Sequence, residues 1–199
     1  WVGAARLAQS LLQALLALLR CPYCGTRLSL VENNALIRRG ADIESGVLGC
    51  ECCAFPVIAG IPVMMADETT RDALHALEAG RSDQALFGLL GLSDDTARQE
   101  HFRMLITKDT ATYRDALELL CRDAEGTYFL YRFTDPTFLI AEALLRAIGQ
   151  QDWPVRGRTL DLCGGSGHLT QVLTGLRPLG GTLVPGTVLA DVYFWKLWL

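Results

Sequence analysis

The chain has 199 residues, half of them apolar, with a net charge of -4 and an isoelectric point near 5.4. The apolar content excludes a disordered protein and suffices for one large domain, or for a small module and a larger one. The acidic balance provides no electrostatic footprint for a nucleic-acid backbone, so the composition disfavours a nucleic-acid-binding protein.

The first element expected is a helix over Ala4–Leu19, where alanine and leucine are interrupted by Arg6, Gln9 and Gln13. No small-residue cleavage site follows it, which argues against a signal peptide. No run reaches the roughly 18 apolar residues that a membrane span needs. We therefore expect no membrane span and a cytoplasmic protein, whose cysteines are thiols or metal ligands rather than disulfides.

The pattern divides the chain into three regions and predicts a mixed α/β protein. Residues 1–65 combine a short helix with strand-forming segments and hold five of the seven cysteines, residues 66–150 are helical, and residues 151–199 begin an α/β domain. Strands are expected in the first region at Arg27–Val31, Ala35–Arg38, Gly46–Gly49 and Phe55–Val57.

Cap residues and glycines mark the helices of the second region, which we interpret as a connector or lid. One helix carries Leu74 and Leu77 and ends before Gly80, and a second starts at Ser82. A third is expected from about Asp109 to Gly126. The fourth starts at Thr134 or Asp135 with Pro136 in its first turn and runs to Gly149. Just before it, Tyr131 or Arg132 either faces the pocket that follows or packs in the core at the entry to this helix.

After Trp153-Pro154 the pattern changes to strand, glycine-rich turn and helix, at Arg158–Leu162, Cys163–Gly167 and His168–Leu176. A second strand, Thr187–Val192, follows a loop rich in glycine and proline. This order is the first half of a β-α-β unit. The chain starts at Trp1 and ends in an apolar run, so we expect sequence to be missing at both ends and this domain to be truncated at the C-terminus.

The cysteines of the first region have the spacing of a zinc site. Cys21-Pro-Tyr-Cys24-Gly25 forms one knuckle, and Cys50-Glu-Cys52-Cys53 supplies the second. Two knuckles separated by strands make a zinc ribbon, and four thiolates form the closed tetrahedral site of a structural metal. We favour Cys21, Cys24, Cys50 and Cys53, because Cys50 and Cys53 have the usual two-residue spacing; the alternative pairs Cys50 with Cys52. Buried apolar cysteines and a redox Cys-x-x-Cys are the competing interpretations.

This first region resembles the small zinc-ribbon proteins that act as activator subunits of methyltransferases, a module also fused ahead of bacterial methyltransferases. The resemblance rests on Leu15-Leu-Ala-Leu-Leu-Arg-Cys-Pro-Tyr-Cys24 and on Ala54-Phe-Pro-Val-Ile-Ala-Gly-Ile-Pro-Val63, and covers about residues 11–65. It implies a structural zinc ion. The gap before the aromatic-proline pair is shorter than in that family.

The turn in Thr159-Leu-Asp-Leu-Cys-Gly-Gly-Ser-Gly-His168 has the composition of a nucleotide-type site. Glycines allow the backbone to bend and to approach a ligand where a side chain would block it. The turn matches neither the G-x-G-x-x-G of a dinucleotide site nor a P-loop, which ends in Gly-Lys-Ser/Thr. A packing turn without a ligand is the competing interpretation.

Because Asp161 precedes the turn, the segment resembles the first motif of class I S-adenosylmethionine-dependent methyltransferases, Asp/Glu-x-Gly-x-Gly-x-Gly. Asp161, Gly165 and Gly167 match it, while Cys163 replaces the first glycine and Gly164 offers compensation. In that family the acidic residue helps to hold the amino-acid end of the cofactor, and an acidic residue ending the second strand accepts hydrogen bonds from the ribose hydroxyls. The resemblance implies cofactor-binding roles for Asp161, Cys163, Gly164, Gly165, Ser166, Gly167 and Asp191. For Asp191 the alternative is a solvated strand end.

The sequence thus predicts an S-adenosylmethionine-dependent methyltransferase with a structural zinc ribbon. Its partners would be the cofactor and an unidentified methyl acceptor, expected to be a small molecule, and the acceptor-binding residues would lie beyond Leu199, so this fragment alone should be inactive. The oligomeric state and the catalytic base are not predicted. The rival is a non-catalytic zinc-ribbon scaffold that activates a partner methyltransferase.

Overall fold

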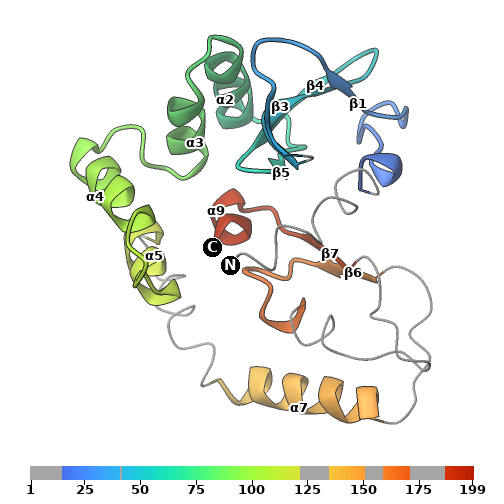
Figure 1. Cartoon of the computed structure of the whole chain (residues 1–199). Coiled ribbons are helices and arrows are strands. Elements are labelled where there is room, and N and C mark those ends of the chain that lie inside the picture. Colours follow the sequence, from blue (N-terminus) through green and yellow to red (C-terminus); the bar gives the residue numbers. More distant parts are fainter. Residues whose placement is uncertain (1–14, 41, 122–134, 151–158, 171–186) are drawn as a thin grey trace. The chain divides into compact units, whose positions relative to one another are not determined.

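A computed structural model describes residues 15–40, 42–121, 135–150, 159–170 and 187–199 of the chain (Figure 1). It combines helices with an antiparallel and a parallel sheet, which confirms the mixed α/β class. The chain separates into two compact units, Trp1–Thr96 and Ala97–Leu199. In the described residues, no helix has both the length and the apolar character to cross a membrane.

The first unit is built on an antiparallel sheet with strand β3 at its centre. Strands β1 and β2 pair with successive parts of β3, strand β4 pairs with Ser45–Gly49 of β3, and β5 pairs with β4. A register shift lies between Ile37 and Arg38 of β2. The strands are β1 (Ser29–Val31), β2 (Ile37–Arg39), β3 (Asp42–Gly49), β4 (Ala54–Ile58) and β5 (Ile61–Pro62).

The core of this sheet lies under β3 and β4, whose apolar side chains Leu48, Phe55 and Val57 are each at most 2% exposed. Cys21 and Leu28 belong to the same buried cluster. The first cysteine knuckle is thereby anchored in the hydrophobic core, which contributes roughly 25 cal/mol for every Å² of apolar surface buried. Removal of either sheet strand would therefore also disturb the cysteines.

Two helices complete the first unit by contacting this sheet. Helix α2 (Glu68–Glu78) contacts β3 and β4, and helix α3 (Ser82–Leu89) contacts β4. The carboxylate of Asp67 caps α2 by accepting a 2.7 Å hydrogen bond from the Thr70 amide, which satisfies an otherwise unpaired backbone donor. The helices predicted before Gly80 and from Ser82 are confirmed.

The second unit contains the described helices α4 (Thr96–Ile106), α5 (Tyr113–Leu120), α7 (Pro136–Gln150) and α9 (Phe194–Trp198). Helix α4 was not predicted. Helix α5 begins later than expected from Asp109, because Thr112 and Asp115 form a capping box that fixes its first turn. Helix α7 begins at Pro136, next to the predicted start, and the Asp135 carboxylate accepts a 2.8 Å bond from the Thr137 amide there.

Strands β6 (Thr159–Leu162) and β7 (Thr187–Ala190) of the second unit pair in parallel, with Thr159 opposite Thr187 and Leu162 opposite Ala190. Parallel strands require a crossover connection, usually a helix. A helix begins at residue 168, directly after the glycine-rich turn. The two strands and the helix start follow the predicted order, and β7 ends two residues earlier than expected.

Several predictions fall on parts of the chain outside the described residues. These are residues 4–14 of the opening helix, Tyr131 and Arg132, and the segments 171–176 and 178–186 between the glycine-rich turn and β7. Residues 15–18 of the opening helix are described and are helical.

Candidate metal centre and candidate cofactor site

The first cysteine knuckle is a short loop closed by backbone hydrogen bonds. The amide of Cys21 donates to the carbonyl of Thr26 at 2.9 Å, and the amide of Gly25 donates back to the carbonyl of Cys21 at 2.9 Å. Gly25 has a φ of 72°, in the left-handed region that a residue without a side chain adopts at little cost. This reversal turns both Cys21 and Cys24 toward one side of the loop.

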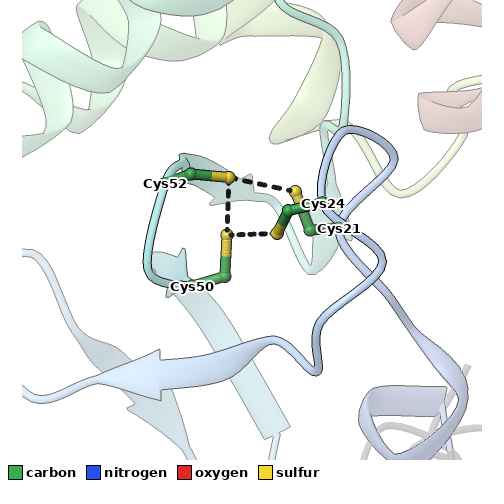
Figure 2. Close-up of side chains that lie close together, drawn as sticks. All are labelled: Cys21, Cys24, Cys50 and Cys52. Carbon is green, nitrogen blue, oxygen red and sulfur yellow. Dashed lines mark hydrogen bonds between the residues drawn. The ribbon is translucent and has the colours of Figure 1, made fainter.

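The second knuckle is the loop that joins β3 to β4. Gly49 and Ala54 form the last pair of the β3–β4 ladder, and the amide of Cys50 donates to the carbonyl of Cys53 at 2.9 Å. Residues 50–53 therefore form a tight turn whose position is fixed by the longest strand pairing of the sheet. Its cysteines lie beside the first knuckle (Figure 2).

Four sulfur atoms from the two knuckles lie within 4.8 Å of one another, those of Cys21, Cys24, Cys50 and Cys52. Sulfur–sulfur distances are 3.9 Å for Cys21–Cys52, 3.7 Å for Cys24–Cys50 and 3.6 Å for Cys50–Cys52 (Figure 2). Zinc–sulfur bonds of about 2.3 Å in a tetrahedron place the sulfurs about 3.8 Å apart. These three distances are close to that spacing, and the four thiols could hold a metal ion.

The fourth member of this group differs from our expectation, which favoured Cys53. The sulfur of Cys52 completes the group, whereas Cys53 is half-buried and packs against the hydrophobic cluster of the sheet. Cys53 directly precedes β4, in which Ala54 is exposed and the next four residues are all buried. The tight turn exposes Cys52 at its tip, so the one-residue spacing from Cys50 to Cys52 replaces the usual two.

The cysteine pKa values differ according to their surroundings. The Thr26 hydroxyl, 2.9 Å from the Cys24 sulfur, lowers the pKa of Cys24, and a hydrogen bond from the Cys52 backbone lowers the pKa of Cys50 to about 6. Burial raises the pKa of Cys21, and the neighbouring sulfurs, that of Cys24 first, raise the pKa of Cys52. Since metals bind thiolates, Cys24 and Cys50 are the two ligands most ready to bind. All seven cysteines are described, and none is in a disulfide.

The glycine-rich turn lies at the carboxyl end of β6, where it bends sharply away from the sheet. The amide of Cys163 donates to the Ala190 carbonyl at 2.8 Å, which extends the β6–β7 ladder by one bond. Cys163 then adopts a φ of 58°, and Gly165 a φ of 61°. For a residue with a side chain this left-handed conformation costs roughly 1–2 kcal/mol. Strain of this kind concentrates at ligand sites.

Gly164 is required by lack of space rather than by its backbone angles. A Cβ atom at this position would lie 2.5 Å from Cδ1 of Leu189 and 2.6 Å from both Cγ and Oδ2 of Asp161. Ordinary carbon contacts are 3.5–4.0 Å, so no side chain fits without movement of its neighbours. The turn is thereby pressed against the ends of both parallel strands.

Two carboxylates flank this turn, and they are the two that the sequence singled out. The Oδ2 atom of Asp191 accepts a 3.0 Å hydrogen bond from the Gly165 amide, and its Oδ1 atom accepts a 2.9 Å bond from the Tyr193 amide. The Oδ2 atom of Asp161 accepts a hydrogen bond from the Thr170 hydroxyl. Each carboxylate oxygen has two lone pairs, so both groups retain capacity to accept further hydrogen bonds. Asp161, the glycines and Asp191 are therefore brought together.

The helices of the second unit add two contacts to the turn that the sequence did not reveal. The Tyr113 hydroxyl on α5 lies 2.8 Å from the Ser166 hydroxyl, and Oε2 of Glu142 on α7 lies 2.9 Å from Nε2 of His168. Arg146 and then His168 lower the pKa of Glu142 by hydrogen bonding, which keeps its carboxylate ionised. No local pattern announces these pairs, because 53 and 26 residues separate their members.

Two other histidines, His75 and His101, are exposed. Comparison with models of protein families, with curated proteins and with solved structures gave no match. The candidate sites consequently rest on their own geometry and chemistry.

Proposed function

We propose that this chain is part of an S-adenosylmethionine-dependent methyltransferase of Rossmann-like fold, in which a zinc ribbon is a structural module. The observation that carries the proposal is the direct hydrogen bond from the glycine-turn amide of Gly165 to Asp191 at the end of the neighbouring parallel strand. Ligands of open α/β sheets bind outside the carboxyl ends of the strands, which is where this turn and this carboxylate meet.

The donor groups at the turn suit this cofactor. S-Adenosylmethionine carries a sulfonium cation, an ammonium group and ribose hydroxyls, and it supplies the transferable methyl group. It has no phosphate, so its site needs hydrogen-bond acceptors rather than a P-loop lysine. Asp161 and Asp191 are such acceptors, and the described turn, residues 163–167, contains no lysine or arginine.

Each residue of the turn then has a definite task. Asp191 accepts hydrogen bonds from the two ribose hydroxyls, Asp161 holds the amino-acid end, and the backbone from Cys163 to Gly167 lines the cofactor between them. Because Gly164 leaves no space for a side chain against Leu189 and Asp161, the backbone and the carboxylate keep a fixed spacing. Catalysis in such a site comes mainly from holding donor and acceptor in line and from excluding water.

The zinc ribbon serves stability in this proposal. Cys21, Cys24, Cys50 and Cys52 supply four thiolates, which leaves no open position for water or substrate. Thiolates remain reduced in the cytoplasm, where we place the protein. The methyl acceptor is a small molecule rather than a nucleic acid, since the chain carries a net charge of -4.

Calorimetric titration with S-adenosylmethionine tests the proposal on the purified chain. The Asp191→Asn variant should bind at least tenfold more weakly, because hydrogen bonds to a charged group contribute about 1.5–3 kcal/mol. Asp109→Asn, an exposed position in the same unit, is the matched control and should bind like the unchanged chain. No heat from a folded chain, or equal affinity of the two variants, would contradict the proposal. Absence of binding would favour the non-catalytic scaffold instead.

A further inference from the structure

Five cysteines surround a site with room for four ligands. The group that fits a tetrahedral metal consists of Cys21, Cys24, Cys50 and Cys52, yet the sulfur of Cys53 lies only 3.3 Å from that of Cys52. This is the shortest of the sulfur–sulfur distances between the knuckle cysteines. The fifth thiol therefore touches the ligand set without belonging to it.

The position of the fifth thiol brings it within reach of the same metal ion. A sulfur bound to zinc has other ligand sulfurs about 3.8 Å away, and Cys53 is already closer than this to Cys52. A change between staggered rotamers of the Cys53 side chain moves its sulfur by roughly 3 Å without moving the backbone. Such a change is enough to exchange a contact with the core for a contact with the metal.

The backbone of the loop is suited to either arrangement. The Cys50 amide bonds to the Cys53 carbonyl, and Gly49 pairs with Ala54, so the main chain on both sides of the two cysteines is fixed. Cys52 is exposed at the loop tip, whereas Cys53 is half-buried beside the core cluster. Cys50 and Cys53 also have the two-residue separation that is usual in zinc knuckles.

A disulfide between the two adjacent cysteines is a poor alternative explanation for their proximity. Neighbouring Cα atoms across a trans peptide are about 3.8 Å apart, while disulfides need about 4.4–6.8 Å. The structure has no cis peptide bond among its described residues. The short sulfur–sulfur distance is thus a contact between two free thiols beside the metal site.

We propose that Cys53 is an alternative fourth ligand that exchanges with Cys52 on one zinc ion, while Cys21, Cys24 and Cys50 stay bound. This inference rests on the metal site of the proposed function and is independent of the cofactor. In the exchange the Cys53 thiol loses its proton and forms the new zinc–sulfur bond. The bond from zinc to Cys52 breaks, and the Cys52 thiolate takes up a proton. Four thiolates hold the metal in each state, so charge and coordination number are unchanged.

The exchange predicts a redundancy that a fixed four-cysteine site lacks. Loss of Cys52 alone leaves Cys53 to complete the tetrahedron, and loss of Cys53 alone leaves Cys52. Loss of both leaves three thiolates. Cys50 has no such substitute, because it contacts the sulfurs of Cys24 and Cys52 from the other side of the turn.

The test uses the chain loaded with Co²⁺, whose thiolate charge-transfer absorption reports the number of bound sulfurs. Cys52→Ser and Cys53→Ser should each keep one metal per chain and the absorption of four thiolates. The double variant should lose about a quarter of that absorption and bind the metal at least tenfold more weakly. Cys121→Ser, which changes a cysteine of the other unit, is the control for a general effect of losing a thiol.

Two results would overturn the proposal: a three-thiolate spectrum in either single variant, or a four-thiolate spectrum in the double variant. A second measurement on the unchanged zinc-loaded chain avoids any folding defect of the variants. Limited alkylation followed by peptide mapping should divide the label between Cys52 and Cys53, with no more than one of these two residues labelled in each zinc-bound chain; label on Cys121 and the exposed Cys163 is counted separately. Label confined to Cys53 would show that Cys52 is the fixed fourth ligand. Cofactor titration is unaffected by either outcome, so the two proposals fail separately.

Discussion

Substitution of Gly164 by alanine tests whether the glycine-rich turn depends on a missing side chain. The new Cβ atom would lie 2.5 Å from Leu189 and 2.6 Å from two atoms of the Asp161 carboxyl group. To restore ordinary contacts of about 3.5 Å, these groups or the turn must move by about 1 Å. Overpacking of this kind costs about 1–3 kcal/mol. Movement of Asp161 would also strain its hydrogen bond from Thr170.

We therefore expect Gly164→Ala to lower the free energy of unfolding of the second unit by about 1–3 kcal/mol and to weaken binding of S-adenosylmethionine at least tenfold. Denaturant titration and calorimetry measure the two effects. At Gly91 the φ is 68° and no other group lies within 4 Å of the position of a new Cβ atom, so Gly91→Ala measures the cost of a left-handed backbone without a steric clash. Gly88→Ala, whose nearest atom is 3.8 Å away, is the control for the glycine-to-alanine change in a helix. Unchanged stability and affinity in Gly164→Ala would refute the reasoning.

Three further predictions concern the second unit. Cys163→Gly should stabilise it by roughly 0.5 kcal/mol in denaturant titration, because relief of left-handed strain exceeds the added unfolded-state entropy; destabilisation would contradict this. Hydrogen bonds from the Thr112 side chain and backbone lower the pKa of Asp115 in the folded protein. The ionised carboxylate therefore stabilises the fold fully at pH values above the pKa of Asp115 in the unfolded chain, and this stabilisation is lost as the pH falls through the lower pKa of the folded protein. Asp115→Asn should accordingly lower the melting temperature at pH 7, and the difference should shrink as the pH falls below the ordinary aspartate pKa of 3.8; a difference that does not change with pH would count against the capping box. Tyr113→Phe, which removes the bond to Ser166, should cost about 0.5–1.5 kcal/mol by the same titration, and an unchanged midpoint would mean that the bond adds no stability.

The elements that sequence predicted best are those whose signals are local. Asp67 and Asp135 stand at helix starts, where their side chains bond the first unpaired amides. Ser82 is the first residue of α3, although no side chain caps that helix. The glycine-rich turn after β6 and the loop rich in glycine and proline before β7 marked these two strands, although their parallel pairing depends on contacts between distant segments. Helix α4 was missed because its apolar residues form only a weak stripe, with Phe102 and Leu105 as its buried side chains.

The same distinction between local and distant signals explains which parts of the two candidate sites could be predicted from the sequence. Asp161 and Asp191 were predicted at the turn from the resemblance to the first methyltransferase motif, and the parallel pairing of β6 with β7 explains why they lie at one edge of the sheet. The choice between Cys52 and Cys53 depended on which side chain the β3–β4 turn directs into the core, and cysteine spacing carries no information on that direction. The partners of Ser166 and His168 come from helices far along the chain, where only packing decides the contact.

The irregular position of the glycine motif follows from two separate requirements of the turn. Cys163 has a left-handed backbone, but its side chain is exposed. A residue other than glycine at this position therefore adds backbone strain but no steric clash. Gly164 does not have a left-handed φ, but there is no space for a Cβ atom at its position. Gly167 has a left-handed φ of 82°, and a Cβ atom there would also lie 3.1 Å from a Leu189 side-chain atom. Glycine is consequently indispensable at 164 and 167 and replaceable at 163. The departure from the methyltransferase motif that this segment resembles thus falls at the position where the turn tolerates a side chain best.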